Sequence, residues 1–150
     1  MTRLLALLAV GVAPACGATL GPDTLSVTLS TSSPTFPADG PFGITVTAVN
    51  QSSRRVQWGE GSSGCQLDAV IRVAGRDYSV LATRVCTADF GPHALEPGAS
   101  RTETWEWEGE YLTDDGLVPV PAGTYQFRGR AGQSATSPAV LVTVTAPGGY

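Results

Sequence analysis

The feature that most constrains the fold is an alternation of apolar and polar residues from residue 25 onward. It occurs in short runs separated by clusters rich in Gly, Pro, Ser, Asn and Asp. Successive side chains of a β-strand point to opposite faces, so this pattern predicts strands with one buried face. No convincing helical period and no internal repeat follows residue 16. About seven or eight short strands at regular spacing therefore predict an all-β, antiparallel β-sandwich.

The runs define the expected elements. Leu25, Val27 and Leu29 form one inward row, and Phe42, Ile44 and their successors form the next. The segment 74–77, Ala-Gly-Arg-Asp, is typical of a tight hairpin turn. We expect strands over residues 25–30, 42–48, 56–58, 66–73, 78–82, 101–108, 123–129 and 139–145, and loops over 59–64, 89–98 and 109–122.

The N-terminus predicts export. Arg3 precedes an apolar run over residues 4–12, and the small residues 13–15 form a cleavage site, so residues 1–15 have the layout of a bacterial export signal. The run is too short to span a bilayer. Cys16 would follow the cut, at the position where exported lipoproteins carry lipid. Ala13 stands where a lipid-attachment signal usually has Leu, so ordinary cleavage, releasing a soluble periplasmic or secreted protein, is the alternative to anchoring at the cell envelope.

Residues 16–23 contain Gly and Pro and are interpreted as a tether, and residues 24–146 as the sandwich domain. Cys65 and Cys86 remain as a pair, and disulfides persist in exported proteins. A bridge would close a loop of about 20 residues and contribute about 3 kcal/mol. A hairpin between them would bring the two together. The rival, a zinc site, needs about four ligands, and only His93 could join the thiols.

Bulk properties exclude several classes of function. The formal net charge is −4, and no basic run is longer than Arg54-Arg55. Nucleic-acid binding needs clustered cations, so it is not expected. No later apolar stretch approaches membrane length. The acidic balance favours solubility and identifies no partner.

Candidate catalytic residues are few. His93 is the only histidine and could serve a nucleophile such as Cys86. We interpret it instead as an exposed loop residue, and a single histidine excludes the usual blue-copper site. Glu106 and Glu108 resemble a glycosidase pair, but they share one strand face, whereas such pairs come from separate elements. We interpret them as a solvated face.

Two further groups could bind ligands. Asp114 and Asp115 could donate oxygens to Ca²⁺ with Glu108 or Glu110, but no calcium-loop motif is present. We interpret them as an Asp-Gly turn connecting two strands. The tryptophans could form a stacking surface. Trp105 and Trp107 fall on an inward row and are predicted to be core, while Trp58 stays open. The sequence thus predicts no enzyme, cofactor or metal site.

An ordered set of motifs resembles a known family. The pieces are the strand-and-turn segment 44–53, the strand and Gly hairpin 65–75, the Leu-Glu-Pro-Gly turn 95–98 before Trp105 and Trp107, and the strand entry 121–125. Over residues 25–145 they are most similar to the bacterial immunoglobulin-like, intracellular proteinase inhibitor domain of the BsuPI type. The end of the chain also resembles the immunoglobulin-like module of flagellar hook-capping proteins.

The resemblance implies an immunoglobulin-like fold and a non-enzymatic, protein-binding function, with proteinase inhibition as one specific activity. The partner would be a proteinase or an envelope component, contacted by loops at one end of the sandwich. The candidates are residues 59–64, 86–98 and 109–122, and the sequence does not choose among them. The alternative is a structural or adhesive domain of an envelope assembly that uses an exposed sheet edge. A hydrolase using His93 ranks last.

Overall fold

The computed structural model describes residues 25–38, 40–80, 84–133 and 135–146 of the 150-residue chain. The predicted export signal, Cys16 and the tether lie outside the described residues. In the described part, no helix is long and apolar enough to cross a membrane.

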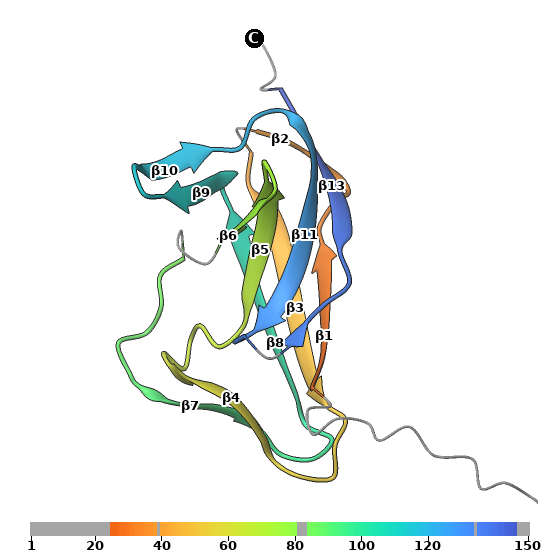
Figure 1. Ribbon diagram of the computed structural model, residues 1–150, viewed down its shortest axis with the longest axis vertical. Coiled ribbons are helices and arrows are strands. Elements are labelled where there is room, and N and C mark those ends of the chain that lie inside the picture. The colour runs from red at the N-terminus through yellow and green to blue at the C-terminus, as the bar shows by residue number, and fades with distance from the viewer. Residues whose placement is uncertain (1–24, 39, 81–83, 134, 147–150) are drawn as a thin grey trace, which may run out of the picture.

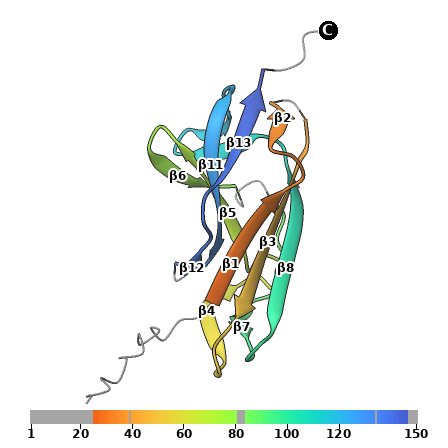
Figure 2. The same cartoon turned by 90° about the vertical axis from the view of Figure 1, so that its right-hand side faces the viewer.

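Two sheets pack face to face as an immunoglobulin-like β-sandwich (Figures 1 and 2). The first has the order β1-β3-β8 and consists of β1 (Leu25–Thr31), β3 (Phe42–Asn50) and β8 (Ser100–Trp107). The second has the order β2-β13-β11-β5-β6, with β12 also paired to β11. Its strands are β2 (Thr35–Pro37), β5 (Asp68–Val73), β6 (Arg76–Ser79), β11 (Gly123–Ala131), β12 (Ala135–Thr136) and β13 (Val140–Thr145).

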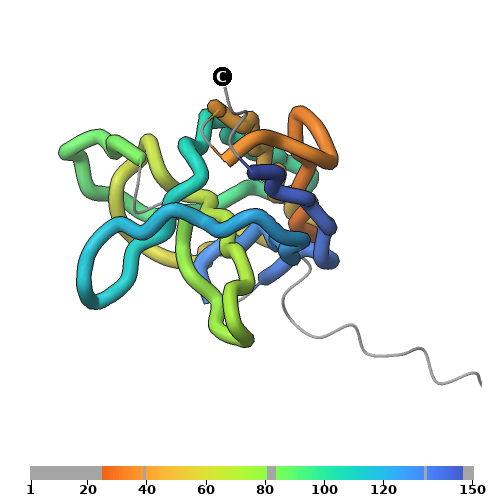
Figure 3. Tube along the Cα trace, turned by 90° about the horizontal axis from the view of Figure 1, so that it is seen from above, coloured from red at the N-terminus to blue at the C-terminus, as the bar shows by residue number. Residues whose placement is uncertain are grey.

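Two short antiparallel ribbons extend from the sandwich. One pairs β4 (Val56–Gly61) with β7 (Gly91–Leu95), and the other pairs β9 (Glu110–Thr113) with β10 (Gly116–Pro119). They lie toward opposite ends of the long axis (Figure 1). Seen from above, the β9–β10 ribbon projects from the body beside the β5–β6 hairpin (Figure 3). The rings of Tyr111 and Tyr78 pack at a tilt, with centroids 4.7 Å apart.

The all-β sandwich is therefore confirmed, with three corrections. The described residues form thirteen strands, where seven or eight were expected. One pair, β2 with β13, is parallel. The expected loops 59–64, 89–98 and 109–122 were wrong in part, because they contain the end of β4, all of β7, and the β9–β10 ribbon. These segments carry Gly or Pro, which are depleted in strands and tolerated at edges.

The core lies between the two sheets and contains the predicted inward rows. Trp107 and Phe127 are fully buried and meet edge to face at 5.3 Å between ring centroids. Phe36 stacks on Phe42 at 4.3 Å. The predicted rows that include Leu25, Phe42, Trp105 and Val142 all face inward. The sheets therefore bury the apolar half of each alternating run, as the pattern predicts.

The predicted hairpin turn is present between β5 and β6. Ala74 and Gly75 have φ angles of 49° and 81°, which is the two-residue turn whose twist matches the flanking strands. Arg76 and Asp77 already belong to β6. Beyond β6, the Val80 amide donates to the Ala69 carbonyl at 2.9 Å, so the chain continues back along the start of β5. This return brings the segment after residue 83 toward Cys65.

Candidate protein-binding site

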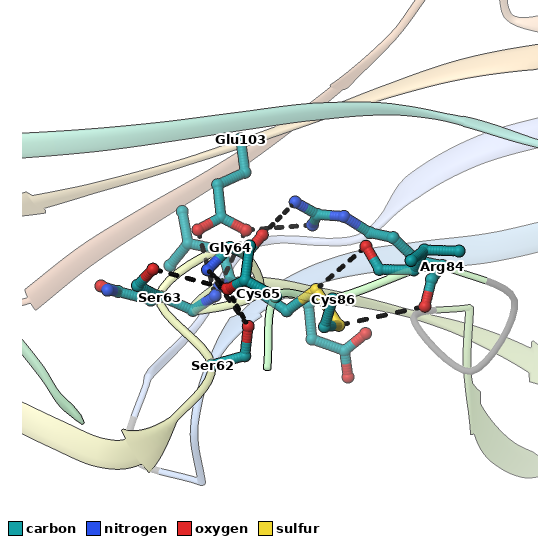
Figure 4. Close-up of a disulfide and its surroundings, with 12 residues drawn as sticks. Ser62, Ser63, Gly64, Cys65, Arg84, Cys86 and Glu103 are labelled. Atoms are coloured by element: carbon teal, nitrogen blue, oxygen red, sulfur yellow. Dashed lines mark hydrogen bonds and ion pairs between the residues drawn. A yellow bond between two sulfur atoms is a disulfide. The ribbon is translucent and has the colours of Figure 1, made fainter. Parts of the chain in front are cut away.

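A disulfide joins Cys65 to Cys86, as the sequence predicts, with Cα atoms 5.6 Å apart (Figure 4). Cys65 is buried just before β5, whereas Cys86 is exposed. The bridge therefore fixes a surface segment to the edge of the core. We call residues 84–90 the bridged loop.

A buried carboxylate, that of Glu103, contacts the chain on both sides of the disulfide. Glu103 lies on β8, on the same face as Trp105 and Trp107, and its side chain is 5% exposed. It accepts hydrogen bonds from the backbone amides of Gln66 at 3.0 Å and Leu67 at 3.3 Å. Such bonds compensate the loss of hydration that burying a charge entails. Sequence reasoning missed Glu103, although the period of two places it on the inward row.

Two arginines complete the environment of Glu103. Arg84 pairs with one carboxylate oxygen at 3.0 Å and Arg101 with the other at 2.6 Å. Arg84 also donates to the Gly64 carbonyl at 2.6 Å, and its guanidinium lies 4.7 Å from the ring centroid of Trp105. The first residue of the bridged loop is thus held inward by an ion pair, a hydrogen bond and a cation–π contact.

Hydrogen bonds hold the middle of the bridged loop. Thr87 Oγ1 contacts Ser62 Oγ at 2.8 Å and accepts from the Gly64 amide at 3.1 Å. The Thr87 hydroxyl also donates to Asp89, which accepts from the Ser63 amide at 3.3 Å. Hydrogen bonds from Ser63 and Thr87 hold the pKa of Asp89 below its usual value. Residues 62–64 and 87–89 are therefore joined by side chains of both segments.

Two apolar side chains of the bridged loop point into solvent. Val85 is 96% exposed and Phe90 is 77% exposed. Val85 lies between Arg84 and Cys86, whose side chains are both engaged with the body of the protein. Val85 is thus an exposed aliphatic side chain between two residues whose side chains are fixed.

His93 is not the exposed loop residue that we expected. It belongs to β7 and is buried. Its Nε2 lies 3.1 Å from the Ser62 carbonyl, and its ring centroid is 6.3 Å from that of Trp58. Cys86, the suggested nucleophile, is held in the disulfide. The structure therefore does not assemble a nucleophile–base pair from these two residues.

All three tryptophans are buried, including Trp58, whose burial the sequence left open. Trp58 Nε1 donates to the Gln66 carbonyl at 3.0 Å, and Trp107 Nε1 donates to the Glu110 carbonyl at 2.5 Å. Trp105 lies under Arg84. A stacking surface for carbohydrate is not formed by these rings.

The carboxylates considered for catalysis or Ca²⁺ lie elsewhere. Asp114 and Asp115 form the turn of the β9–β10 ribbon, beside an open groove of about 580 Å³ that Arg76 and Tyr78 also line. A second hollow, of about 460 Å³, is lined by residues 40–41 and by Glu106, Glu108 and Glu110. Among the described residues, no group of three or more His, Cys, Asp or Glu is placed to hold a metal ion.

The candidate loops do not form one surface. Residues 59–64 and the start of 86–98 meet at the bridged loop, through the contacts of Ser62 and Gly64 with Thr87. Residues 109–122 form the β9–β10 ribbon toward the other end of the molecule (Figure 1). A single binding end can therefore include the first two segments and leaves out the third.

No known protein family matches the sequence, and no curated protein matches it. Among solved structures, the chain is similar to a β-glucosidase from Erythrobacter marinus (17% identity, TM-score 0.47, 80% of this chain and 15% of that one). It is also similar to a GH3 β-glucosidase from Bifidobacterium adolescentis (14%, 0.48, 81% and 17%) and to a CARDB domain from Pyrococcus furiosus (12%, 0.46, 81% and 94%). The chain thus spans less than a fifth of each of these two glucosidases.

Proposed function

We propose that this protein is an exported, non-enzymatic protein-binding module that contacts its partner through the bridged loop, with proteinase inhibition as its specific activity. The observation that carries the proposal is the exposure of Val85 and Phe90 on a loop fixed by a disulfide, by Glu103 and by Thr87. Ordering a flexible loop costs free energy on binding, and a loop that is already ordered avoids that cost.

The bridged loop combines exposed apolar side chains with several polar contacts that fix its backbone, and this combination supports a binding role. Exposed apolar side chains contribute little to folding, while the clamps need several paired groups to hold one short segment. Val85 and Phe90 are the two most exposed large apolar side chains among the described residues. Their place at the one end where two candidate loops meet makes them the centre of the proposed interface.

The export signal and the disulfide support a location outside the cytoplasm. A disulfide persists in oxidising compartments, and residues 1–15 have the layout of an export signal. We propose that lipid on Cys16 holds the mature protein at the cell envelope. The variant Cys16→Ser should be released from the membrane fraction, and retention equal to wild type would contradict the anchor.

The inhibitory activity is tested with the purified, oxidised protein and a panel of secreted serine, cysteine and metalloproteinases. We expect stoichiometric inhibition of at least one class. The variant Phe90→Asp should weaken it, while Leu141→Asp, a matched change at an exposed leucine of β13, should not. Absence of inhibition across the panel would contradict the proposal.

A second candidate is the structural or adhesive domain of an envelope assembly. The observation that favours it is the position of β8, which is eight residues long and ends the order of its sheet. An edge strand can pair with a strand of a partner. Co-purification with one fixed envelope component, unchanged by substitution of Val85 or Phe90 and without proteinase inhibition, would favour this candidate.

A further inference from the structure

An open groove lies between the β5–β6 hairpin and the β9–β10 ribbon, and none of its lining residues belongs to the bridged loop. We propose that this groove binds an uncharged polysaccharide. The ring of Tyr78 packs against the face of a sugar unit. The side chains of Arg76, Asp114 and Asp115 hold its hydroxyl groups. This site adds a second kind of ligand to the proposed protein-binding function and does not depend on that function.

Two segments that are distant in the sequence form the walls of the groove. Arg76 and Tyr78 come from β6, and Thr113, Asp114 and Asp115 come from the end of β9 and the turn that follows it. The hairpin and the ribbon project side by side in the view from above (Figure 3). The groove volume of about 580 Å³ falls in the range of about 300–1,000 Å³ that is typical of small-ligand sites. The groove can therefore hold a short stretch of a sugar chain.

The apolar part of the groove is formed by Tyr78, Leu112 and Val118. The Tyr78 ring packs at a tilt on that of Tyr111, which is buried, with ring centroids 4.7 Å apart. A sugar ring presents C–H groups on its faces, and these are attracted to the negative face of an aromatic ring. Tyr78 is thus an aromatic side chain that the protein already holds in place beside the groove.

The turn that carries the two carboxylates is fixed by its own hydrogen bonds. The Thr113 hydroxyl donates to the Gly116 carbonyl at 3.0 Å and accepts from the Asp115 amide at 3.3 Å. At the base of the ribbon, the Val120 amide donates to the Gly109 carbonyl at 2.7 Å. Both walls are therefore formed without a ligand, and binding does not have to order them.

The polar part of the groove carries charges of both signs that have no partner. Within the described part of the chain, the side chains of Arg76, Asp114 and Asp115 make no ion pair and no hydrogen bond. By contrast, Arg72 and Asp77 of the same hairpin pair with each other at 3.2 Å. Groups of opposite charge that line one groove without pairing are available to a ligand that lies between them.

An uncharged sugar satisfies both walls at once. Each hydroxyl group donates and accepts, so one sugar unit can donate to a carboxylate and accept from the Arg76 guanidinium. Adjacent hydroxyls match the two oxygens of a carboxylate and the fork of a guanidinium, and hydrogen bonds to charged groups are the stronger kind. A peptide would need both charges at the right spacing, and exposed ion pairs contribute little. A metal ion would leave Arg76 and Tyr78 unused.

The first test measures binding of oligosaccharides by calorimetry. The purified, oxidised protein is titrated with oligomers of glucose, mannose, galactose and N-acetylglucosamine, and we expect at least one to bind at a single site. Asp114→Asn/Asp115→Asn and Arg76→Gln should each weaken that binding by about 10-fold or more, because a hydrogen bond to the sugar loses its charged partner. Asp77→Asn and Arg72→Gln change the exposed pair outside the groove and should bind like wild type.

The second test locates the bound oligosaccharide by NMR. Changes in amide chemical shift should be confined to β6 and the β9–β10 ribbon, and the bridged loop should be unaffected. Phe90→Asp, which tests the proposed protein contact, should bind the oligosaccharide like wild type, so the two proposals fail separately. The inference is overturned if no oligomer binds at millimolar concentration, or if the shift changes centre outside the groove. Binding of a peptide of mixed charge in the groove in place of the sugars would overturn the ligand class.

Discussion

At the scale of single residues, Glu103 connects three segments that are distant in the sequence. It receives the amides of residues 66 and 67, the guanidinium of Arg84 and that of Arg101. Only an ionised carboxylate can accept all of these bonds at once. A substitution at this buried position should therefore affect stability and the bridged loop together.

The variant Glu103→Gln tests this role. It keeps the shape of the side chain but leaves both arginines without their counter-charge, and we expect a loss of about 2–3 kcal/mol in the free energy of unfolding. This loss lies near the lower end of the range for breaking a buried ion pair, because the arginines keep some contact with water. Glu106→Gln, on the exposed face of the same strand, should change it by less than about 0.5 kcal/mol. Equal urea midpoints for the two variants would contradict the role of Glu103.

Asp89 predicts a pH dependence of the bridged loop. Its pKa in the folded protein lies below the reference value of 3.8, because Ser63 and Thr87 donate hydrogen bonds to the carboxylate. The ionised form is favoured by folding, so this contribution is fully present above about pH 3.8 and is lost as the pH falls through the folded pKa. Carboxyl titration by NMR should give a value below 3.8 for Asp89. A value at or above 3.8 would contradict the clamp.

At the scale of secondary-structure elements, Gly129 of β11 lies where that strand packs against the opposite sheet. Gly129 lies on the inward row of β11, between Phe127 and Ala131. A Cβ added there would lie 2.9 Å from Val46 Cγ1 and 3.3 Å from Leu29 Cβ. The absence of a side chain at Gly129 therefore lets β11 lie close to β1 and β3 of the opposite sheet.

Gly129→Ala should therefore destabilise the sandwich by about 1–3 kcal/mol through overpacking. Gly91→Ala is the matched control, since a Cβ there would meet nothing within 4 Å. Thermal unfolding of both variants, followed by circular dichroism, measures the difference. A Gly129→Ala variant as stable as the Gly91→Ala variant would show that the sheets can separate slightly at no cost.

The elements also show what sequence reasoning could and could not predict. β3, β8 and β11 were predicted, over residues 42–48, 101–108 and 123–129, because apolar and polar residues alternate along them. β7 was missed because Gly91 and Pro92 indicate a loop, and only pairing with β4 makes the segment a strand. The buried state of His93 follows from that pairing and from the contact with Trp58, neither of which a local pattern contains.

The candidate site was predictable only in part, for the same physical reason. The disulfide follows from two cysteines on either side of a hairpin. The exposure of Val85 does not, because it depends on the inward contacts of Arg84, and these depend on a carboxylate from β8. Local alternation determines which side of a strand is buried, whereas the side chains that fix a loop come from strands far away in the chain.

On the scale of the whole molecule, the two ribbons lie toward opposite ends of the sandwich (Figure 1), and the disulfide joins the segment after β4 to the segment before β7. The bridge links residues 21 positions apart. It restricts the unfolded chain, and it also fixes the bridged loop in the folded protein. These two effects predict different results and can be measured separately.

The double variant Cys65→Ser/Cys86→Ser separates them. Loss of the crosslink should lower the free energy of unfolding by about 3 kcal/mol, since the unfolded chain gains the entropy of an open loop. Within the folded state, hydrogen exchange should accelerate around residues 85–88 and stay slow in β3 and β11, because Arg84 and the strands keep their own contacts. Faster exchange throughout the sandwich under conditions where the protein remains folded would show that the bridge supports the core. Unchanged exchange in the bridged loop would show that Glu103 and Thr87 suffice to hold it.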